Sequence, residues 1–138
     1  LGRACIDIRH RNGRVLYMLW KGIAKFMNLL NKKYLFGCCS ITSQNPSEGL
    51  AVYEHLKMGG FVSDTYFAEV TPNYECLSFI DSPCSDLKVE IPQLFKLYLE
   101  LGCKVCSKPA LDREFKTIDF LILLNLNSFS RESRALFL

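Results

Sequence analysis

The sequence lacks any hydrophobic run long enough to cross a membrane as a helix. A spanning helix needs about 20 consecutive apolar residues, whereas a run such as Phe120 to Leu124 has the length of a buried strand. Internal repeats and low-complexity stretches are absent as well. We therefore expect a chain that is neither integral to a membrane nor collagen-like nor intrinsically disordered.

A large excess of charge of one sign is also absent. The 138 residues carry 17 Lys and Arg against 14 Asp and Glu, a net charge of +3, and the longest basic block is Arg9-His10-Arg11. This balance argues against nucleic-acid binding and leaves a mild preference for anionic partners such as phosphates or lipid surfaces. Because 49% of the residues are hydrophobic, we expect one domain over residues 1–126 and a polar tail over 127–138.

The sequence has no initiator Met and no signal peptide before its first strand-like residues. We therefore expect it to be the C-terminal part of a longer protein. Its seven cysteines are an odd number and several lie within apolar runs, which favours packed thiols in a reducing cytosol. The pair Cys103 and Cys106 has the spacing of a zinc or redox motif, but no second pair accompanies it, so we predict no metal site.

The order of the elements predicts an α/β fold. Residues Arg3–Ile8 have the pattern of a strand, a turn follows, and a long apolar helix then precedes a second strand at Tyr34–Ile41. A strand, a helix and a strand in that order predict a parallel crossover. We expect the helix to be buried on most of its circumference except for one polar stripe, which consists of Lys21, Lys25, Asn28 and Lys32.

Two more helices have recognisable ends. The first should begin at Asn45, with Pro46 in its first turn and Glu48 completing a capping box, and should stop at Gly59 or Gly60. The other should run over Ile91–Leu101 and stop at Gly102. Between these helices the pattern is weaker. It predicts a strand at Phe61–Val70 and turns at Pro72-Asn73 and Asp81-Ser82-Pro83.

The end of the domain predicts two strands, Cys103–Ser107 and Ile118–Leu126. The charged connection Lys108–Thr117 is too long for a tight hairpin. Two interpretations of it stay open, a substrate-facing loop and a solvated loop.

Three stretches resemble a known family. They are Leu1–Ala24, with Arg11-Asn12-Gly13 inside it, then Tyr34–Ser40, and then Leu101–Phe120. Together they resemble the hemolysin-like N-acyltransferases of the GNAT superfamily, which include the lyso-ornithine-lipid and glycine-lipid synthases. The resemblance implies a GNAT-like mixed sheet flanked by helices that begins at the fourth strand, so that the N-terminal strands are missing.

The resemblance also implies a reaction. Such enzymes move a 3-hydroxyacyl group from acyl carrier protein to the α-amine of an amino acid, here ornithine or glycine, in aminolipid synthesis. The expected donor is an acyl-phosphopantetheine, carried by acyl carrier protein or by CoA, with no permanently bound cofactor. The expected location is the cytoplasm, with peripheral contact at the inner membrane. Two alternatives remain, a CoA-dependent acetyltransferase of a small amine and a non-catalytic remnant that only binds the acyl donor.

Residues Arg11, Asn12, Gly13 and Arg14 occupy the place where GNAT proteins hold the donor phosphate. Backbone amides at a helix start favour anions, and Arg9 would add a further positive charge. The superfamily's usual loop is matched imperfectly here, because His10 and Val15 replace two of its characteristic residues. The alternative interpretation is a basic turn that merely starts a helix.

Three further residues are candidates by the same resemblance. Tyr53 lies on a helix like the one whose tyrosine protonates the departing thiolate in the superfamily, and its alternative is a packed core tyrosine. Asp112 and Asp119 lie where related proteins carry acidic residues, which suits binding of the substrate ammonium. Their alternatives are structural: Asp112 capping its loop, and Asp119 pairing with Arg3 or Arg113. The base for the amine is not assigned.

Overall fold

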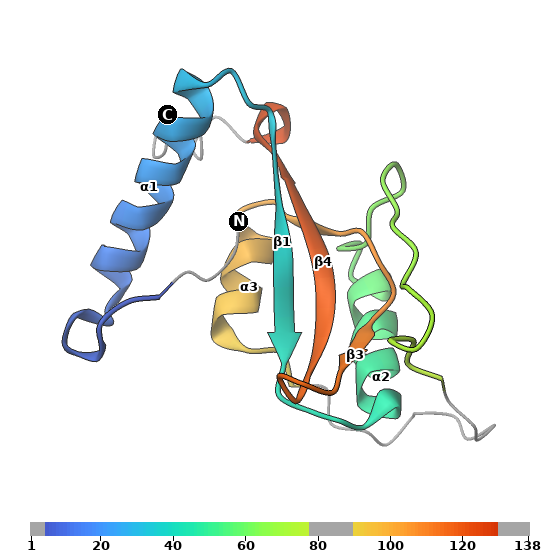
Figure 1. Ribbon diagram of the computed structural model, residues 1–138. Coiled ribbons are helices and arrows are strands. Elements are labelled where there is room, and N and C mark those ends of the chain that lie inside the picture. Colours follow the sequence, from blue (N-terminus) through green and yellow to red (C-terminus); the bar gives the residue numbers. More distant parts are fainter. Residues whose placement is uncertain (1–4, 78–89, 130–138) are drawn as a thin grey trace.

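The computed structural model describes residues 5–77 and 90–129 (Figure 1). Three α-helices and a small sheet make up this part of the chain. The elements in order are η1 (Ile8–His10), α1 (Gly13–Leu29), β1 (Tyr34–Ile41), α2 (Pro46–Met58), α3 (Gln93–Glu100), β2 (Lys104–Val105), β3 (Ala110–Asp112), β4 (Thr117–Asn125) and η2 (Leu126–Ser128).

The sheet is built around β4. Strand β1 pairs antiparallel with β4 along its whole length, from Tyr34 opposite Asn125 to Ile41 opposite Ile118. Strands β2 and β3 also pair antiparallel with β4, and the order across the sheet is β1-β4-β2. The result is an open antiparallel sheet flanked by helices, which confirms the α/β prediction and is compatible with a GNAT-like fold.

One face of this sheet forms the core. Burial alternates along β4, whose side chains at 118, 120, 122 and 124 are buried while their neighbours are half-buried. Helix α3 covers this face, with the rings of Phe95 and Phe120 5.6 Å apart. Helix α2 covers it beside α3, because Gly49 lies directly against Ile118. The even positions of β4 therefore hold α2 and α3 to the sheet.

Helix α1 contacts the core along a narrow stripe only. Its N-cap is Asn12, whose side chain accepts from the Val15 amide at 3.0 Å. Trp20, Ala24 and Met27 are its buried side chains, and Trp20 packs edge-on against Tyr98 of α3 with centroids 5.1 Å apart. The prediction that α1 is buried on most of its circumference is wrong, because its remaining apolar positions face away from the sheet: Met18, Leu19, Phe26 and Leu29 are exposed.

The predicted first strand is absent from Cys5–Ile8, and Arg3 lies outside the described residues. The chain there is extended and then turns into η1, because the carboxylate of Asp7 accepts from the Arg9 amide at 2.9 Å. The parallel crossover is therefore wrong for the described part of the chain. Parallel pairing occurs in it at isolated bridges, Val62 with Val105 and Ala68 with Ser107. The predicted strand Phe61–Val70 is reduced to these single bridges.

The three α-helices end in the same way. In each, a residue with positive φ follows the C-cap, and the next amide donates to a carbonyl five residues back, which is a Schellman ending. The residues with positive φ are Asn31, Gly60 and Gly102. The predicted stops at Gly59 or Gly60 and at Gly102 are thus confirmed.

The start of α2 agrees with the prediction in two respects. Asn45 is the N-cap, its side chain accepts from the Ser47 amide at 3.1 Å, and Pro46 follows at the first helical position. The capping box with Glu48 is not formed, because the backbone N–H of Asn45 donates to the hydroxyl of Ser43 at 3.0 Å. Glu48 instead accepts from the side-chain amide of Asn45 at 3.5 Å.

The predicted loop Lys108–Thr117 contains a strand. Residues Ala110–Asp112 form β3, which pairs with β4 through a short turn in which Lys116 has φ of 59°. The second part of the connection is therefore a hairpin between β3 and β4, a strand pairing that the sequence did not predict. The turn Pro72-Asn73 is present, with Asn73 at φ of 76°, whereas Asp81-Ser82-Pro83 lies outside the described residues. Of the tail, η2 and Phe129 are described.

Candidate functional site

A groove of about 360 Å³ follows the edge of β1 that faces away from β4. All six residues from Leu35 to Ser40 line it. Since successive strand residues point to opposite faces, a cavity that touches six in a row lies along the strand edge rather than on one face. Among the described residues, strand β1 pairs with β4 alone.

The other walls of the groove are mainly apolar. Trp20 of α1 and Tyr98 of α3 stand together at one side, and the remaining walls come from α3 and the sheet: Pro92, Leu94, Phe95, Cys103, Ile122 and Leu124. An apolar groove with a polar strand edge suits a ligand that is part hydrocarbon and part amide.

Thiols contribute to this groove without forming a disulfide. Cys38, Cys39 and Cys103 line it and are free. Burial raises the pKa of Cys39 to about 12, with further contributions from Cys103 and Cys38, and burial likewise raises the pKa of Cys103 to about 12. These thiols therefore remain neutral and act as small hydrophobic groups. Cys106 is also free and buried, so the Cys103–Cys106 pair is packed, as predicted.

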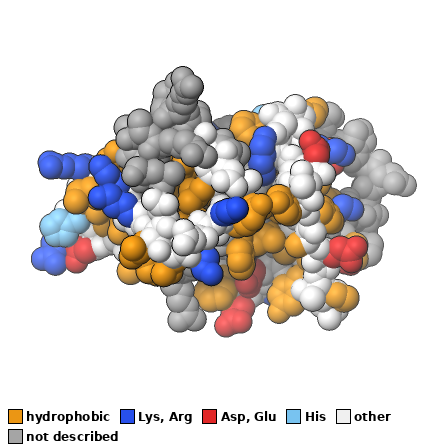
Figure 2. Space-filling model, turned by 90° about the horizontal axis from the view of Figure 1, so that it is seen from above, with side chains coloured by type: hydrophobic (Ala, Val, Ile, Leu, Met, Phe, Trp, Pro, Cys, Tyr) orange, Lys and Arg blue, Asp and Glu red, His pale blue; other side chains and the backbone are white. Residues whose placement is uncertain are grey.

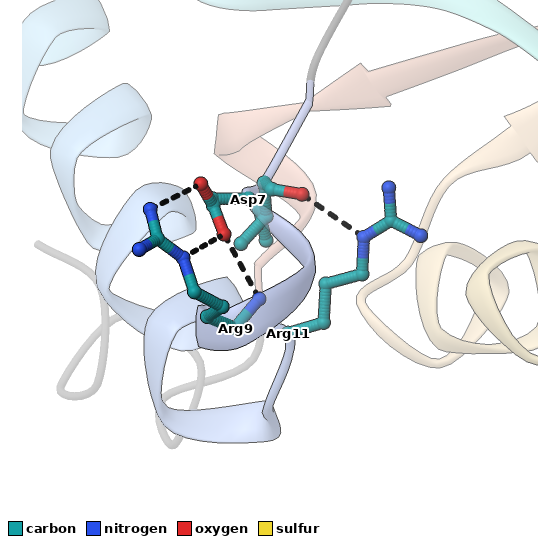
Figure 3. Close-up of polar contacts among 4 residues, drawn as sticks. Asp7, Arg9 and Arg11 are labelled. Atoms are coloured by element: carbon teal, nitrogen blue, oxygen red, sulfur yellow. Dashed lines mark hydrogen bonds and ion pairs between the residues drawn. The ribbon is translucent and has the colours of Figure 1, made fainter.

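The predicted phosphate site lies at the start of α1, outside the set of residues that line the groove. Figure 3 shows how Arg9 and Arg11 are held next to this site. The guanidinium of Arg9 binds the carboxylate of Asp7 through two contacts of 3.0 and 3.1 Å, which lowers the pKa of Asp7 and raises that of Arg9. Arg9 is therefore paired with Asp7, whose negative charge offsets part of the charge that Arg9 was expected to add to a phosphate site.

The remaining groups at this helix start are exposed. Arg11 donates through Nε to the carbonyl of Ile6 at 2.9 Å, which leaves the outer nitrogens of its guanidinium for other contacts. Asn12 is occupied as the N-cap, and a Cβ at Gly13 would meet nothing within 4 Å. Arg14 is exposed as well. The helix start is thus open to an anion, with the orphan amides and two arginines on the same turn.

Tyr53 is buried on α2 at 8% exposure and belongs to the core cluster. It lines a second pocket of about 480 Å³, away from the β1 edge, together with Glu54, Glu75 and Lys108. Residues 11–14 do not line this pocket, and Figure 1 places the start of α1 on the opposite flank of the molecule from α2. The structure therefore does not bring the predicted acid and the predicted phosphate site together.

The two aspartates have structural partners. Asp112 accepts from the amides of Glu114 and Phe115, both at 2.8 Å, and so closes the β3–β4 turn. Asp119 accepts from the hydroxyl of Thr117 at 2.9 Å. The predicted alternative for Asp112, a loop cap, is confirmed. The alternative pairing of Asp119 with Arg113 is not formed, because Arg113 donates to the carbonyl of Asn73.

Residues 5–77 and 90–129 contain neither a metal site nor a membrane-spanning helix. No group of three or more His, Cys, Asp and Glu side chains is placed to hold a metal ion. None of the helices there combines the length and hydropathy required to cross a bilayer.

The β1 groove was not predicted from the sequence. Tyr34–Ile41 was identified as a strand with the observed bounds, and its nearly continuous apolar character is a signal of burial on both faces. The cavity along this edge forms because β4 pairs with the other edge of β1 and α3 packs nearby. Both elements are distant from β1 in sequence, so the cavity could not be predicted.

Comparison with known proteins finds relatives with a shared name. A protein of Brucella abortus named L-ornithine N(alpha)-acyltransferase is 25% identical over 134 residues, which cover 94% of this chain and 48% of the relative. Proteins of the same name from Rhizobium meliloti and Rhodobacter capsulatus are each 27% identical and cover 94% and 97% of this chain, but 45% and 52% of the relatives. No protein-family model matches the chain, and no solved structure matches it significantly.

The chain thus spans about half the length of the curated relatives that it matches. The similarity extends over nearly the whole chain and therefore includes the groove, the start of α1 and the β3–β4 hairpin. This confirms the resemblance to amino-acid N-acyltransferases: the chain is a homologue of proteins named L-ornithine N(alpha)-acyltransferase.

Proposed function

We propose that this chain forms part of an N-acyltransferase of aminolipid synthesis, which moves a fatty acyl group from an acyl-phosphopantetheine donor to the α-amine of ornithine. The observation that carries the proposal is the similarity to L-ornithine N(alpha)-acyltransferases along 94% of the chain or more. The donor that we propose is acyl carrier protein, and glycine is a second candidate acceptor.

The β1 groove suits the donor arm. A phosphopantetheine arm carries amides that can pair with the backbone of a strand, while the acyl chain attached to it requires an apolar wall. The groove supplies both within one cavity of about 360 Å³, with Trp20 and Tyr98 at its side. We place the thioester arm along Leu35–Ser40.

The start of α1 suits the donor phosphate. The amides of Gly13 and Arg14 have no partner within the helix, and the helix dipole favours a negative charge there. Arg11 and Arg14 would add charge-assisted hydrogen bonds to the phosphate oxygens. Phosphate binding at this helix start uses groups other than Arg9, so it is compatible with the pairing of Arg9 to Asp7.

We assign the general acid to Tyr53 and the binding site of the amino acid to the pocket that Tyr53 lines. A phenol hydroxyl can protonate a thiolate as it leaves. Because the Tyr53 pocket is separate from the β1 groove, this role requires the thioester end of the donor to extend from the groove to α2. The carboxylates of Glu54, Glu69 and Glu75 line the same pocket, and they give it a charge that favours a cationic amino acid such as ornithine. Asp112 and Asp119 are kept as weaker candidates for the ammonium, because both already accept hydrogen bonds within the fold.

The first test is lipid mass spectrometry of a host that lacks aminolipids. The complete reading frame containing this chain is expressed, with the Gly13→Asp variant as the matched control. We expect a new N-acyl amino acid lipid whose mass identifies the acceptor, and a reduced amount in the variant. Good soluble expression with ornithine and glycine present but no new lipid would contradict the proposal.

A second measurement separates the remaining alternatives. Purified protein is offered the same acyl group on acyl carrier protein and on CoA, with ornithine as acceptor. Transfer from acyl carrier protein supports the lipid enzyme, and transfer from acetyl-CoA alone favours the small-amine acetyltransferase. Donor binding without product identifies a non-catalytic acyl-donor-binding protein.

A further inference from the structure

The outer side of α1 carries an apolar stripe that contacts nothing in the described core. Phe26 is 62% exposed, Leu29 80% and Met18 61%. At 100° per residue these three side chains lie within about 80° of one another, on the side opposite the buried Trp20 and Met27. Single exposed apolar residues are ordinary, but a continuous stripe along a helix usually marks an interaction surface.

Basic residues border this stripe. Arg14, Lys21 and Lys25 follow each other at helical spacing along one of its edges, and all three are exposed. Seven of the 17 Lys and Arg of the chain lie between residues 8 and 33, whereas no Asp or Glu does. Figure 2 shows this juxtaposition, with basic side chains beside hydrophobic ones at the end of the molecule that α1 occupies.

Charge and apolarity of this kind occur together in helices that lie in a membrane interface. The apolar stripe enters the boundary between headgroups and acyl chains, and the lysines at its edge reach the phosphates. The remainder of the chain, residues 34–138, has more Asp and Glu than Lys and Arg. An anionic surface would therefore attract the α1 end and repel the other end, which orients the molecule.

We propose that α1 docks the protein on an anionic lipid surface through Met18, Phe26 and Leu29, with Lys21 and Lys25 contacting lipid phosphates. The biological reason rests on the proposed function, because an acylated amino acid is an amphiphile that must pass into a bilayer. Trp20, which lines the β1 groove, lies on the other side of the same helix. Docking would hold the groove about one helix diameter from the lipid surface.

The experiment is vesicle co-sedimentation of the full 138-residue chain, which requires no catalytic activity. One set of vesicles is pure phosphatidylcholine and the other contains phosphatidylglycerol. We expect binding to the anionic set that weakens with added salt. The double variants Phe26→Ser/Leu29→Ser and Lys21→Glu/Lys25→Glu should each reduce it by on the order of tenfold or more.

Matched controls alter the same residue types elsewhere. Phe115 is 73% exposed in the β3–β4 turn, and Lys57 and Lys96 are exposed on α2 and α3, so Phe115→Ser and Lys57→Glu/Lys96→Glu should bind like the unchanged chain. Because Trp20 is the single tryptophan and is buried, its fluorescence reports whether α1 remains folded in each variant.

Three results would overturn the proposal. The first is an absence of binding to anionic vesicles by the folded chain, and the second is equal loss of binding in the control variants. The third is a chain that sediments as a dimer without lipid and becomes a monomer on Phe26→Ser/Leu29→Ser, because the stripe would then be an interface between two copies. None of these results bears on whether acyl transfer occurs, which the lipid analysis tests separately.

Discussion

Gly49 on α2 and Ile118 on β4 are in such close contact that a Cβ at position 49 would lie 2.9 Å from Cγ2 of Ile118. The same Cβ would lie 3.3 Å from Cβ of Pro109. The helix approaches the sheet this closely only because residue 49 has no side chain. We therefore expect Gly49→Ala to lower the free energy of unfolding by about 1–3 kcal/mol through overpacking.

Urea denaturation checks this prediction. Gly13→Ala is the control, because a Cβ there would meet nothing within 4 Å, and its free energy of unfolding should change little or rise slightly. A Gly49→Ala protein as stable as the unchanged chain would mean that α2 can move away from Ile118 at no cost.

Gly13→Asp tests the anion site at the start of α1. A carboxylate in the first turn suits the helix dipole, so stability should be kept or slightly increased. The same carboxylate would repel a donor phosphate, and we expect donor binding to weaken on the order of tenfold. Isothermal titration with the acyl donor gives the affinity. Gly22→Asp introduces the same charge at another open position of α1, and it should leave donor binding largely unchanged.

Tyr53→Phe tests the proposed acid. The variant keeps the buried ring and removes the hydroxyl, so kcat should fall at least tenfold while donor affinity is kept. Tyr98→Phe is the informative comparison, because Tyr98 lines the β1 groove and burial raises the pKa of its hydroxyl. If Tyr98→Phe slows transfer and Tyr53→Phe does not, the acid lies on α3 and the assignment to α2 is wrong.

Asp112→Ala tests whether that carboxylate is structural. It removes the acceptor of two backbone amides, those of Glu114 and Phe115, and we expect a loss of about 1–3 kcal/mol in the free energy of unfolding. Asp112→Asn keeps an oxygen acceptor and should lose less. Should both variants remain stable but bind ornithine weakly, the carboxylate would belong to the acceptor site.

Alkaline pH should destabilise the fold through the buried thiols. The pKa values of Cys39 and Cys103 are raised by burial from 9.0 to about 12, so thiols of the unfolded chain ionise first as the pH rises. The contribution to stability is complete below pH 9 and is lost between about pH 9 and 12. Urea unfolding at pH 7.5 and 10.5 measures this loss, and the double variant Cys39→Ala/Cys103→Ala should show a smaller dependence on pH. An unchanged dependence would assign the effect to other groups.

Local chemistry decided the parts of this structure that could be predicted from the sequence. The strand Tyr34–Ile41, the start of α2 at Asn45 and Pro46, and the stops at Gly60 and Gly102 depend on side chains and φ values within a few residues. The resemblance to amino-acid N-acyltransferases was also recognisable from three stretches of the sequence, and the similarity to named relatives confirms it.

Tertiary contacts decided the rest. Whether an apolar helix face is covered depends on what lies beside it, and for α1 the sequence predicted burial where Leu19 and Phe26 are exposed. The residues of β3 have little strand character of their own and pair because β4 offers an edge. The groove along β1 likewise exists because α3, some fifty residues later in the chain, packs beside that edge. The periodicity of a sequence shows which face of a helix or strand is apolar. Which segment packs against that face is decided only by contacts between residues that are distant in sequence.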